Sequence, residues 1–186
     1  MKKCFRVILA FVFISMVLTG CSSRQKGEPI TANVYRFTPY ADWEMETEHP
    51  DNGADYFGIV FLIKPSEAGL CVAYTDRTVH TNVPEAKKRA ELAGQSVGTI
   101  SYEDIVKDEC VIGGRQMYRV VMKCINSDPG LDLDLNPNPA EMWIHVYYFD
   151  TDHGLGEVSI SYNADVDYDP QEDLNQVLNS LEFLEE

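Results

Sequence analysis

Five residues in the middle of the chain match a pattern that can expose a catalytic serine. Gly94-Gln95-Ser96-Val97-Gly98 has the spacing G-x-S-x-G, which in hydrolases places the serine on a sharp turn between a strand and the following helix. Here a helical pattern precedes the serine and a strand pattern follows it. Because the required order is reversed, we interpret Gly94 as a helix stop and assign no catalytic residue.

Three cysteines of the later chain could supply a nucleophilic thiol or a disulfide: Cys71, Cys110 and Cys124. A thiol nucleophile needs a histidine in range, and nothing in the sequence selects one of the four histidines. A glycine turn at Gly113-Gly114 would place Cys110 opposite Met117 and leave Cys124 about seven residues, roughly 23 Å, further along the strand. Cys71 could reach Cys124 only if their strands are neighbours, so we favour free, buried thiols.

Two acidic runs offer the oxygen ligands that calcium prefers. They are Asp132-Leu133-Asp134-Leu135-Asn136 and Asp165-Val166-Asp167-Tyr168-Asp169. Neither fits a calcium loop of the EF-hand type, because Pro137 and Pro170 occupy the position that requires glycine. We predict no metal and no cofactor, and keep Asp132, Asp134, Asp165, Asp167 and Asp169 as the candidates for a calcium-binding alternative.

An aromatic stripe could stack on a sugar or a peptide. One face of a predicted strand carries His145 together with Trp143, Tyr147 and Phe149, which are the odd-numbered positions. Because that strand is apolar on both parities, it is expected to be covered on both faces. We therefore interpret the stripe mainly as core.

The charge of the chain excludes one class of partner. Its 186 residues carry 15 Lys and Arg against 30 Asp and Glu, and no Lys or Arg follows Lys123. The first 20 residues hold three of the basic residues and no acid, so the remainder has a net charge of −18. Such a surface repels phosphates, which argues against nucleic acid as a partner.

The first residues form a signal peptide. A basic start at Lys2, Lys3 and Arg6 precedes an apolar run, residues 7–18, which is shorter than the roughly 20 residues that span a bilayer. The run ends in Leu18-Thr19-Gly20-Cys21, which resembles the lipobox of bacterial lipoproteins at every position.

The lipobox resemblance implies a diacylglycerol on Cys21 and cleavage before it, so the partner at this end is the lipid bilayer, reached through acyl chains. Two or more acyl chains anchor a protein stably. We predict a signal peptide at 1–20, the lipidated Cys21 with a polar tether at 21–30, and a single α+β domain at 31–186 outside the cytoplasm. Inner and outer membranes are both compatible with this pattern.

The order of predicted elements indicates an antiparallel sheet. Strands are predicted at 31–37, 56–64 and 70–74, and a helix capped by Thr81 or Asn82 is predicted to end at Gly94. A hairpin follows at 97–125 with its turn at the two glycines, and then strands at 142–149 and 157–163. The last element is a helix with Asp169 as its cap and Glu172 in a capping box. Strands grouped apart from helices are typical of the α+β class, here with about six to seven strands and helices packed on them.

This layout resembles the PsbP-like α/β/α sandwich, which photosystem accessory subunits, a Ran-binding protein and many small bacterial lipoproteins share. The resemblance rests on Phe37-Thr38-Pro39 with Trp43, on Gly114 with Tyr118, and on the ending Asn179-Ser180-Leu181-Glu182-Phe183. It implies an accessory or binding role and does not fix a ligand.

We therefore expect a membrane-anchored, non-enzymatic binding protein that takes an unknown protein or small-molecule ligand. The alternatives are a thiol- or metal-assisted hydrolase and a calcium-dependent binding module. Because bacterial membranes are usually anionic, we also expect the acidic segments 127–139 and 165–169 to face away from the bilayer.

Overall fold

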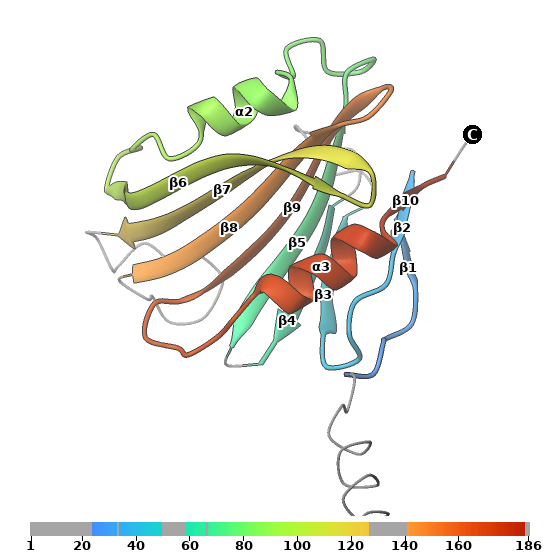
Figure 1. Cartoon of the computed structure of the whole chain (residues 1–186), viewed down its shortest axis with the longest axis horizontal. Helices are drawn as coiled ribbons and strands as arrows, with labels where there is room; N and C mark the ends of the chain where they lie inside the picture. The colour runs from blue at the N-terminus through green and yellow to red at the C-terminus, as the bar shows by residue number, and fades with distance from the viewer. Residues whose placement is uncertain (1–23, 33, 50–58, 66, 127–140, 185–186) are drawn as a thin grey trace, which may run out of the picture.

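A seven-stranded antiparallel sheet forms the body of the protein, with the strand order β3-β4-β5-β9-β8-β7-β6 (Figure 1). This computed structural model describes residues 24–32, 34–49, 59–65, 67–126 and 141–184. The strands of the sheet are β3 (Glu44–His49), β4 (Ile59–Lys64), β5 (Ala68–Asp76), β6 (Ile100–Ile112), β7 (Arg115–Asn126), β8 (Glu141–Asp150) and β9 (Gly154–Asn163). The prediction of an α+β fold with six to seven antiparallel strands is confirmed.

The central hairpin has the predicted turn and register. Gly113 and Gly114 have φ angles of 58° and 79°, the positive values that a two-residue hairpin turn of this hand requires. Cys110 lies opposite Met117 in the β6–β7 ladder. Cys71, Cys110 and Cys124 are free thiols, the favoured alternative, but only Cys124 is buried and the other two are half-buried.

The predicted first strand is in fact two strands. β1 (Ile30–Ala32) and β2 (Tyr35–Phe37) pair antiparallel to each other, with Ala32 opposite Tyr35. Together with β10 (Glu182–Phe183) they form a separate three-stranded sheet. The prediction of one strand over 31–37 was wrong because alternating β-branched and aromatic residues suit both halves of a tight hairpin equally well.

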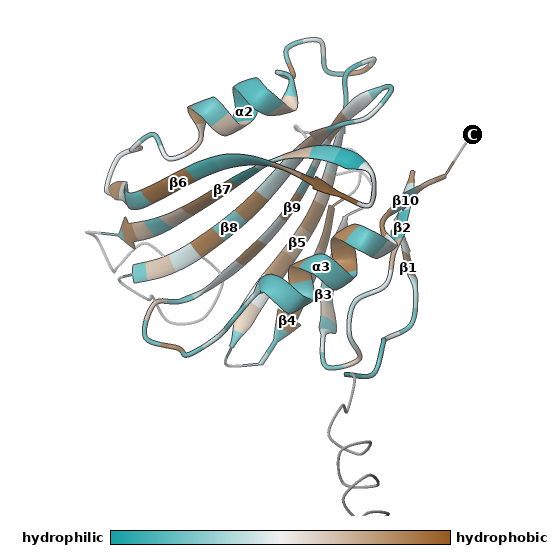
Figure 2. Ribbon diagram, viewed as in Figure 1, coloured by the Kyte–Doolittle hydropathy of each residue, from teal (hydrophilic) through white to brown (hydrophobic). Residues whose placement is uncertain are grey.

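One helix covers each face of the large sheet. α3 (Gln171–Ser180) crosses the face drawn toward the viewer, and α2 (Ala86–Leu92) lies on the other side (Figure 1). The side of α3 that faces away from the sheet is largely hydrophilic (Figure 2). Neither helix among the described residues is long and apolar enough to cross a membrane.

Two hydrophobic cores follow from this arrangement. Buried members of the α3 core include Leu62, Leu70, Val72, Tyr147, Phe149, Val158, Ile160, Leu174 and Leu178. The smaller α2 core contains Ala86, Ala90, Val120, Met122, Val146, Tyr148 and Leu155. Successive residues of β7, β8 and β9 point alternately into the two cores. This explains why β8 is apolar at both its odd and its even positions.

Both helices begin differently from the prediction. α2 has no side-chain cap from its own loop; instead, the Asp150 carboxylate of β8 accepts hydrogen bonds from the Ala86 N–H at 3.1 and 3.2 Å. The proposal of Thr81 or Asn82 as the cap was therefore wrong. At α3 the cap position is Pro170 instead of Asp169, although Asp169 still accepts a hydrogen bond from the Gln171 N–H at 3.0 Å. Glu172 accepts a hydrogen bond from the Tyr40 hydroxyl at 3.1 Å instead of closing the predicted capping box.

Candidate functional site

The structure does not place Ser96 where a nucleophile would act. Ser96 lies on an exposed loop after α2, and the next residue, Val97, pairs with Ile100 in an isolated bridge. Gly94 has a φ of 79°, which suits the end of a helix. A strand therefore does not precede the serine, in agreement with the interpretation of Gly94 as a helix stop.

The described thiols are not activated. Burial, reinforced by the charge of Glu157, raises the pKa of Cys71 to about 12. Burial also raises the pKa values of Cys110 and Cys124. A nucleophilic cysteine needs the opposite shift. His145 belongs to the sheet face that carries α3, since it lies opposite Ile160, whereas Cys71 is on the other face.

The candidate calcium ligands are not gathered into a site. Asp165 and Asp167 are exposed, and Asp169 is engaged at the start of α3. Asp132 and Asp134 lie outside the described residues. Within the described ranges, no three His, Cys, Asp or Glu side chains are close enough to hold a metal ion.

The aromatic stripe divides into core and surface. Tyr147 and Phe149 are buried, as predicted, while Trp143 and His145 are half-buried. His145 Nε2 lies 3.3 Å from the Tyr162 hydroxyl, and its Nδ1 is buried without a hydrogen-bond partner among the described atoms. Burial, with a contribution from the Arg119 charge, lowers the pKa of His145, so the ring is neutral at physiological pH.

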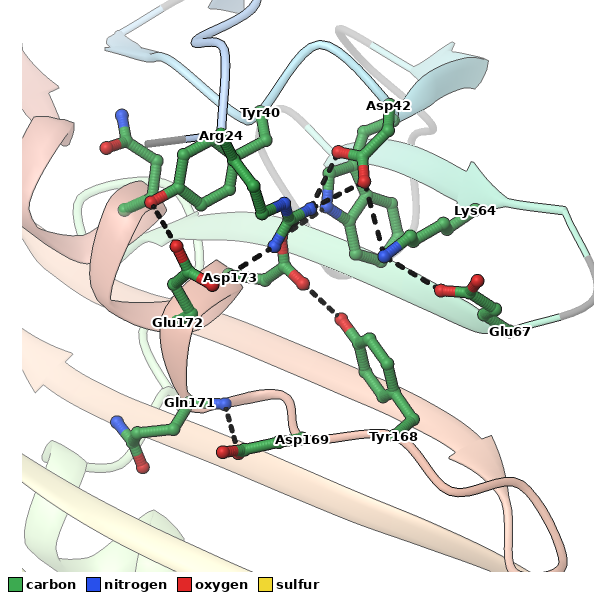
Figure 3. A network of polar contacts seen from close by, with 12 residues as sticks. Arg24, Tyr40, Asp42, Lys64, Glu67, Tyr168, Asp169, Gln171, Glu172 and Asp173 are labelled. Atoms are coloured by element: carbon green, nitrogen blue, oxygen red, sulfur yellow. Dashed lines mark hydrogen bonds and ion pairs between the residues drawn. The ribbon is translucent and has the colours of Figure 1, made fainter. Parts of the chain in front are cut away.

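A polar network that the sequence did not reveal joins the start of the described chain to α3 (Figure 3). The Arg24 guanidinium donates to both oxygens of Asp42 at 2.7 Å and lies 2.8 Å from Asp173 Oδ1. It also stacks over the Tyr40 ring, 4.1 Å from the centroid. Partial burial lowers the pKa of Arg24, but the bonds to Asp173 and Asp42 outweigh it and raise the pKa overall. We call Arg24, Asp42 and Asp173 the Arg24 clamp.

Asp173 is the buried centre of this network. Its side chain is 1% exposed, and its oxygens accept hydrogen bonds from Trp43 Nε1 at 2.9 Å and from the Tyr168 hydroxyl at 2.5 Å. Burial and the bond to Asp173 raise the pKa of Tyr168, which keeps that hydroxyl a donor. One carboxylate thus connects α3 to three separate segments of the chain.

The residues after Arg24 also lie against the domain. The Gly27 N–H donates to the Pro39 carbonyl at 2.8 Å, and the Ala41 N–H donates to the Gln25 carbonyl at 2.9 Å. The described part of the predicted tether is therefore docked rather than extended into solvent. In Figure 1 this docking point is at the lower end of the domain.

A polar cavity of about 480 Å³ lies between the loop before α2, α2 itself and the end of the β5–β9 strand pair. Its size is within the range of small-molecule sites. It is lined by Thr75, Val79, His80, Thr81, Asn82, Val83, Pro84, Arg89, Leu155 and Glu157. We call it the α2 cavity. These segments lie at the upper end in Figure 1, opposite the docking point.

Arg77 holds the loop of the α2 cavity in place. Its guanidinium donates to the Pro84 carbonyl at 2.8 Å and to the Gly154 carbonyl at 3.0 Å, and it forms an ion pair with Asp150. Asp150 in turn caps α2. The end of the loop at Pro84, the β8–β9 turn and the start of the helix are thereby joined to each other.

Glu157 is the residue of the α2 cavity that sequence reasoning missed. It lies on β9, opposite Ala73 of β5 and Tyr148 of β8, on the face covered by α2. Burial raises its pKa, and the positive charge of Arg89 offsets part of that effect. Glu157 is half-buried, and a carboxyl group with a raised pKa inside a cavity is a functional-site candidate. Val158 and Ile160 of the same strand face the α3 core, and the alternation of apolar and polar residues around them does not reveal that α2 covers the opposite face.

Comparisons with known proteins show the fold and no function. No protein-family model and no curated protein matches the sequence. The structure is similar to the solution structure of cyanobacterial PsbP (CyanoP) from Synechocystis sp. PCC 6803, with 13% identity, a TM-score of 0.55, and coverage of 88% of this chain and 95% of that one. The chain therefore has a PsbP-like fold.

A second similar structure is larger. The crystal structure of a protein from Bacteroides thetaiotaomicron VPI-5482 aligns with a TM-score of 0.53 and 10% identity. The alignment covers 87% of this chain and 49% of that chain, so the present chain spans about half of its length.

Proposed function

We propose that the protein is a lipid-anchored binding module outside the cytoplasm, and that the α2 cavity is its ligand site. The resemblance of Leu18-Thr19-Gly20-Cys21 to a lipobox supports the anchor. The polar cavity with the half-buried carboxyl group of Glu157 supports the binding role. The PsbP-like fold is compatible with a non-enzymatic domain of this kind.

The observation that carries the proposal is the α2 cavity, whose segments lie at the upper end of the domain in Figure 1, while the described chain starts at the lower end. Arg24 is three residues after Cys21, and three residues span at most about 11 Å. An acyl chain on Cys21 would hold the end with the Arg24 clamp close to the bilayer. The α2 cavity would then open toward the extracytoplasmic space.

This orientation reverses one expectation for the acidic surface. Tyr168 and Asp169 belong to the clamp end (Figure 3), so segment 165–169 would lie on the membrane side. Repulsion between its aspartates and anionic lipids is screened over about 8 Å at physiological ionic strength. A short, docked tether limits rotation of the domain at any ionic strength, and we therefore expect it to decide the orientation. Segment 127–139 lies outside the described residues.

Blocking the α2 cavity is expected to abolish ligand binding. Val79 lines the cavity and is 64% exposed, so Val79→Trp should fill its mouth with little effect on folding. Val111 is 65% exposed and does not line the cavity, which makes Val111→Trp a matched control. Thermal shift assays with pooled amines, amino acids, organic acids and sugars, using the full-length protein in detergent micelles, would identify ligands.

Hydrogen exchange on the same samples should locate the binding. We expect a ligand to protect segments 79–84 and 155–157, and to have no effect on Val79→Trp. If no pool stabilises the protein, or if both tryptophan variants respond like the wild type, the α2 cavity is not the ligand site.

A further inference from the structure

We propose that the α2 cavity takes a ligand with a primary ammonium group, and that Glu157 is the counter-ion of that group. The inference rests on the proposed binding function of the cavity and adds the chemistry of the ligand. Its basis is the position of Glu157 among the other lining residues, together with the charge of the domain.

Arg89 is the cation whose charge acts on Glu157, and the neighbours of Glu157 on β5 and β9 are apolar. Its neighbour across β5 is Ala73, which is 3% exposed and has no polar side-chain atom. Two residues before Glu157 on β9, on the same face of the sheet, is Leu155, which also lines the cavity. Arg89 favours the carboxylate, yet burial outweighs it. A carboxylate in such a position gains from a cation that enters the cavity.

The rest of the lining offers oxygen acceptors to an ammonium group. A primary ammonium group has three N–H donors, and Thr75, Thr81 and Asn82 supply side-chain oxygens in the same cavity as Glu157. The chain has a formal net charge of −15, which attracts cations and repels anions. An anionic ligand would meet the Glu157 carboxylate at the cavity wall.

The same chemistry covers simple amines and zwitterions. Arg89 and His80 also line the cavity and offer positive or N–H groups to the carboxylate of an amino acid-like ligand. Both kinds of ligand place their ammonium group at Glu157, so matched probes that differ in one charged group distinguish them.

Binding should become tighter as the pH rises, because the carboxylate form of Glu157 is the one that pairs with an ammonium group. The ionisable groups around Glu157 are Arg89 on α2, His80 in the loop, Cys71 on β5 and Tyr148 on β8. Cys71 stays a neutral thiol in the experimental range because its pKa is raised to about 12. In Glu157→Gln the affinity for the amine should therefore rise less with pH than it does in the wild type.

The partial burial of Glu157 should also cost stability at neutral pH. Its folded-state pKa is raised, so the folded protein binds a proton more tightly than the unfolded chain does, and stability falls as the pH rises through the folded-state pKa. Glu157→Gln is therefore expected to raise Tm at pH 8. The gain should disappear below the unfolded pKa of about 4.3, where both states are protonated.

Isothermal titration of the full-length protein in micelles with n-butylamine, 4-aminobutyrate and butyrate tests the inference. We expect heat of binding from one or both of the amine-bearing probes and none from butyrate, with affinity at least tenfold weaker in Glu157→Gln. Glu91→Gln is the matched control, because Glu91 is an exposed glutamate of α2 that does not line the cavity.

Two results would overturn the assignment of the ligand class. One is binding of butyrate alone, and the other is binding of the amines that Glu157→Gln leaves unchanged. If Val79→Trp blocks the binding, either result would still support the α2 cavity as a ligand site. Absence of Val79-sensitive binding for every pool and probe would instead remove the proposed function itself.

Discussion

Replacing Asp173 with alanine is expected to lower the free energy of unfolding by about 3–5 kcal/mol, the usual cost of removing one partner from a buried charged pair. The carboxylate is 1% exposed and contacts Arg24, Trp43 and Tyr168. Its removal leaves the buried indole N–H of Trp43 and the Tyr168 hydroxyl without their acceptor. A buried donor without an acceptor lowers the free energy of unfolding. For a domain of this size the change corresponds to a fall in Tm of roughly 10 °C.

Glu172→Ala is the matched control for this prediction. Glu172 precedes Asp173 on the same helix and is 60% exposed, with its carboxylate 3.8 Å from the Arg24 guanidinium. Exposed ion pairs contribute about 0–1 kcal/mol, so urea denaturation of this variant should resemble that of the wild type. Equal midpoints for the two variants would show that Asp173 does not hold α3 to the start of the domain.

Replacing Cys21 with serine is expected to abolish fatty-acid attachment. The thiol is the atom that the lipobox resemblance assigns to the diacylglycerol thioether, and a serine hydroxyl does not provide it. Cells that express the full chain and receive a clickable palmitate analogue should label the wild type and leave Cys21→Ser unlabelled. This readout also distinguishes a lipid anchor from an uncleaved leader, which would itself hold the protein in the membrane.

Cys4→Ser is the control for the lipid experiment, because Cys4 lies within the leader and outside the lipobox. Its labelling should equal that of the wild type. Absence of label on the wild type would contradict the anchor, and label on Cys21→Ser would place the lipid at another residue.

Local pattern and turn chemistry were sufficient for most of the sheet. The β6–β7 hairpin was predictable because Gly113 and Gly114 fix both the turn and the register, down to the pairing of Cys110 with Met117. The last helix was predictable from its apolar stripe, whose members Leu174, Val177 and Leu178 are buried. Each of these signals lies within a few residues of the element that it specifies.

The features that sequence reasoning missed depend on residues far apart in the chain. The cap of α2 comes from Asp150, 64 positions after Ala86, and the Arg24 clamp joins residues more than 100 positions apart. Glu157 was equally hidden, since its place in an alternating strand suggests a solvent-facing position until α2 is known to cover that face. Tertiary contacts of this kind leave no periodic signal.

A lipid-anchored domain whose α2 cavity opens away from the bilayer is tested most directly by its orientation on the membrane. That orientation depends on both the anchor and the docked tether. A small fluorophore would be attached through an unnatural amino acid at Asp167, near the clamp end, or at Thr81, at the α2 cavity; both side chains are exposed. The lipidated full-length protein would be reconstituted in vesicles whose headgroups carry a nitroxide quencher, with the Cys21→Ser protein as the unanchored reference. We predict strong quenching at position 167 and little at position 81. Equal quenching at both positions, or stronger quenching at 81, would contradict a cavity that opens away from the bilayer.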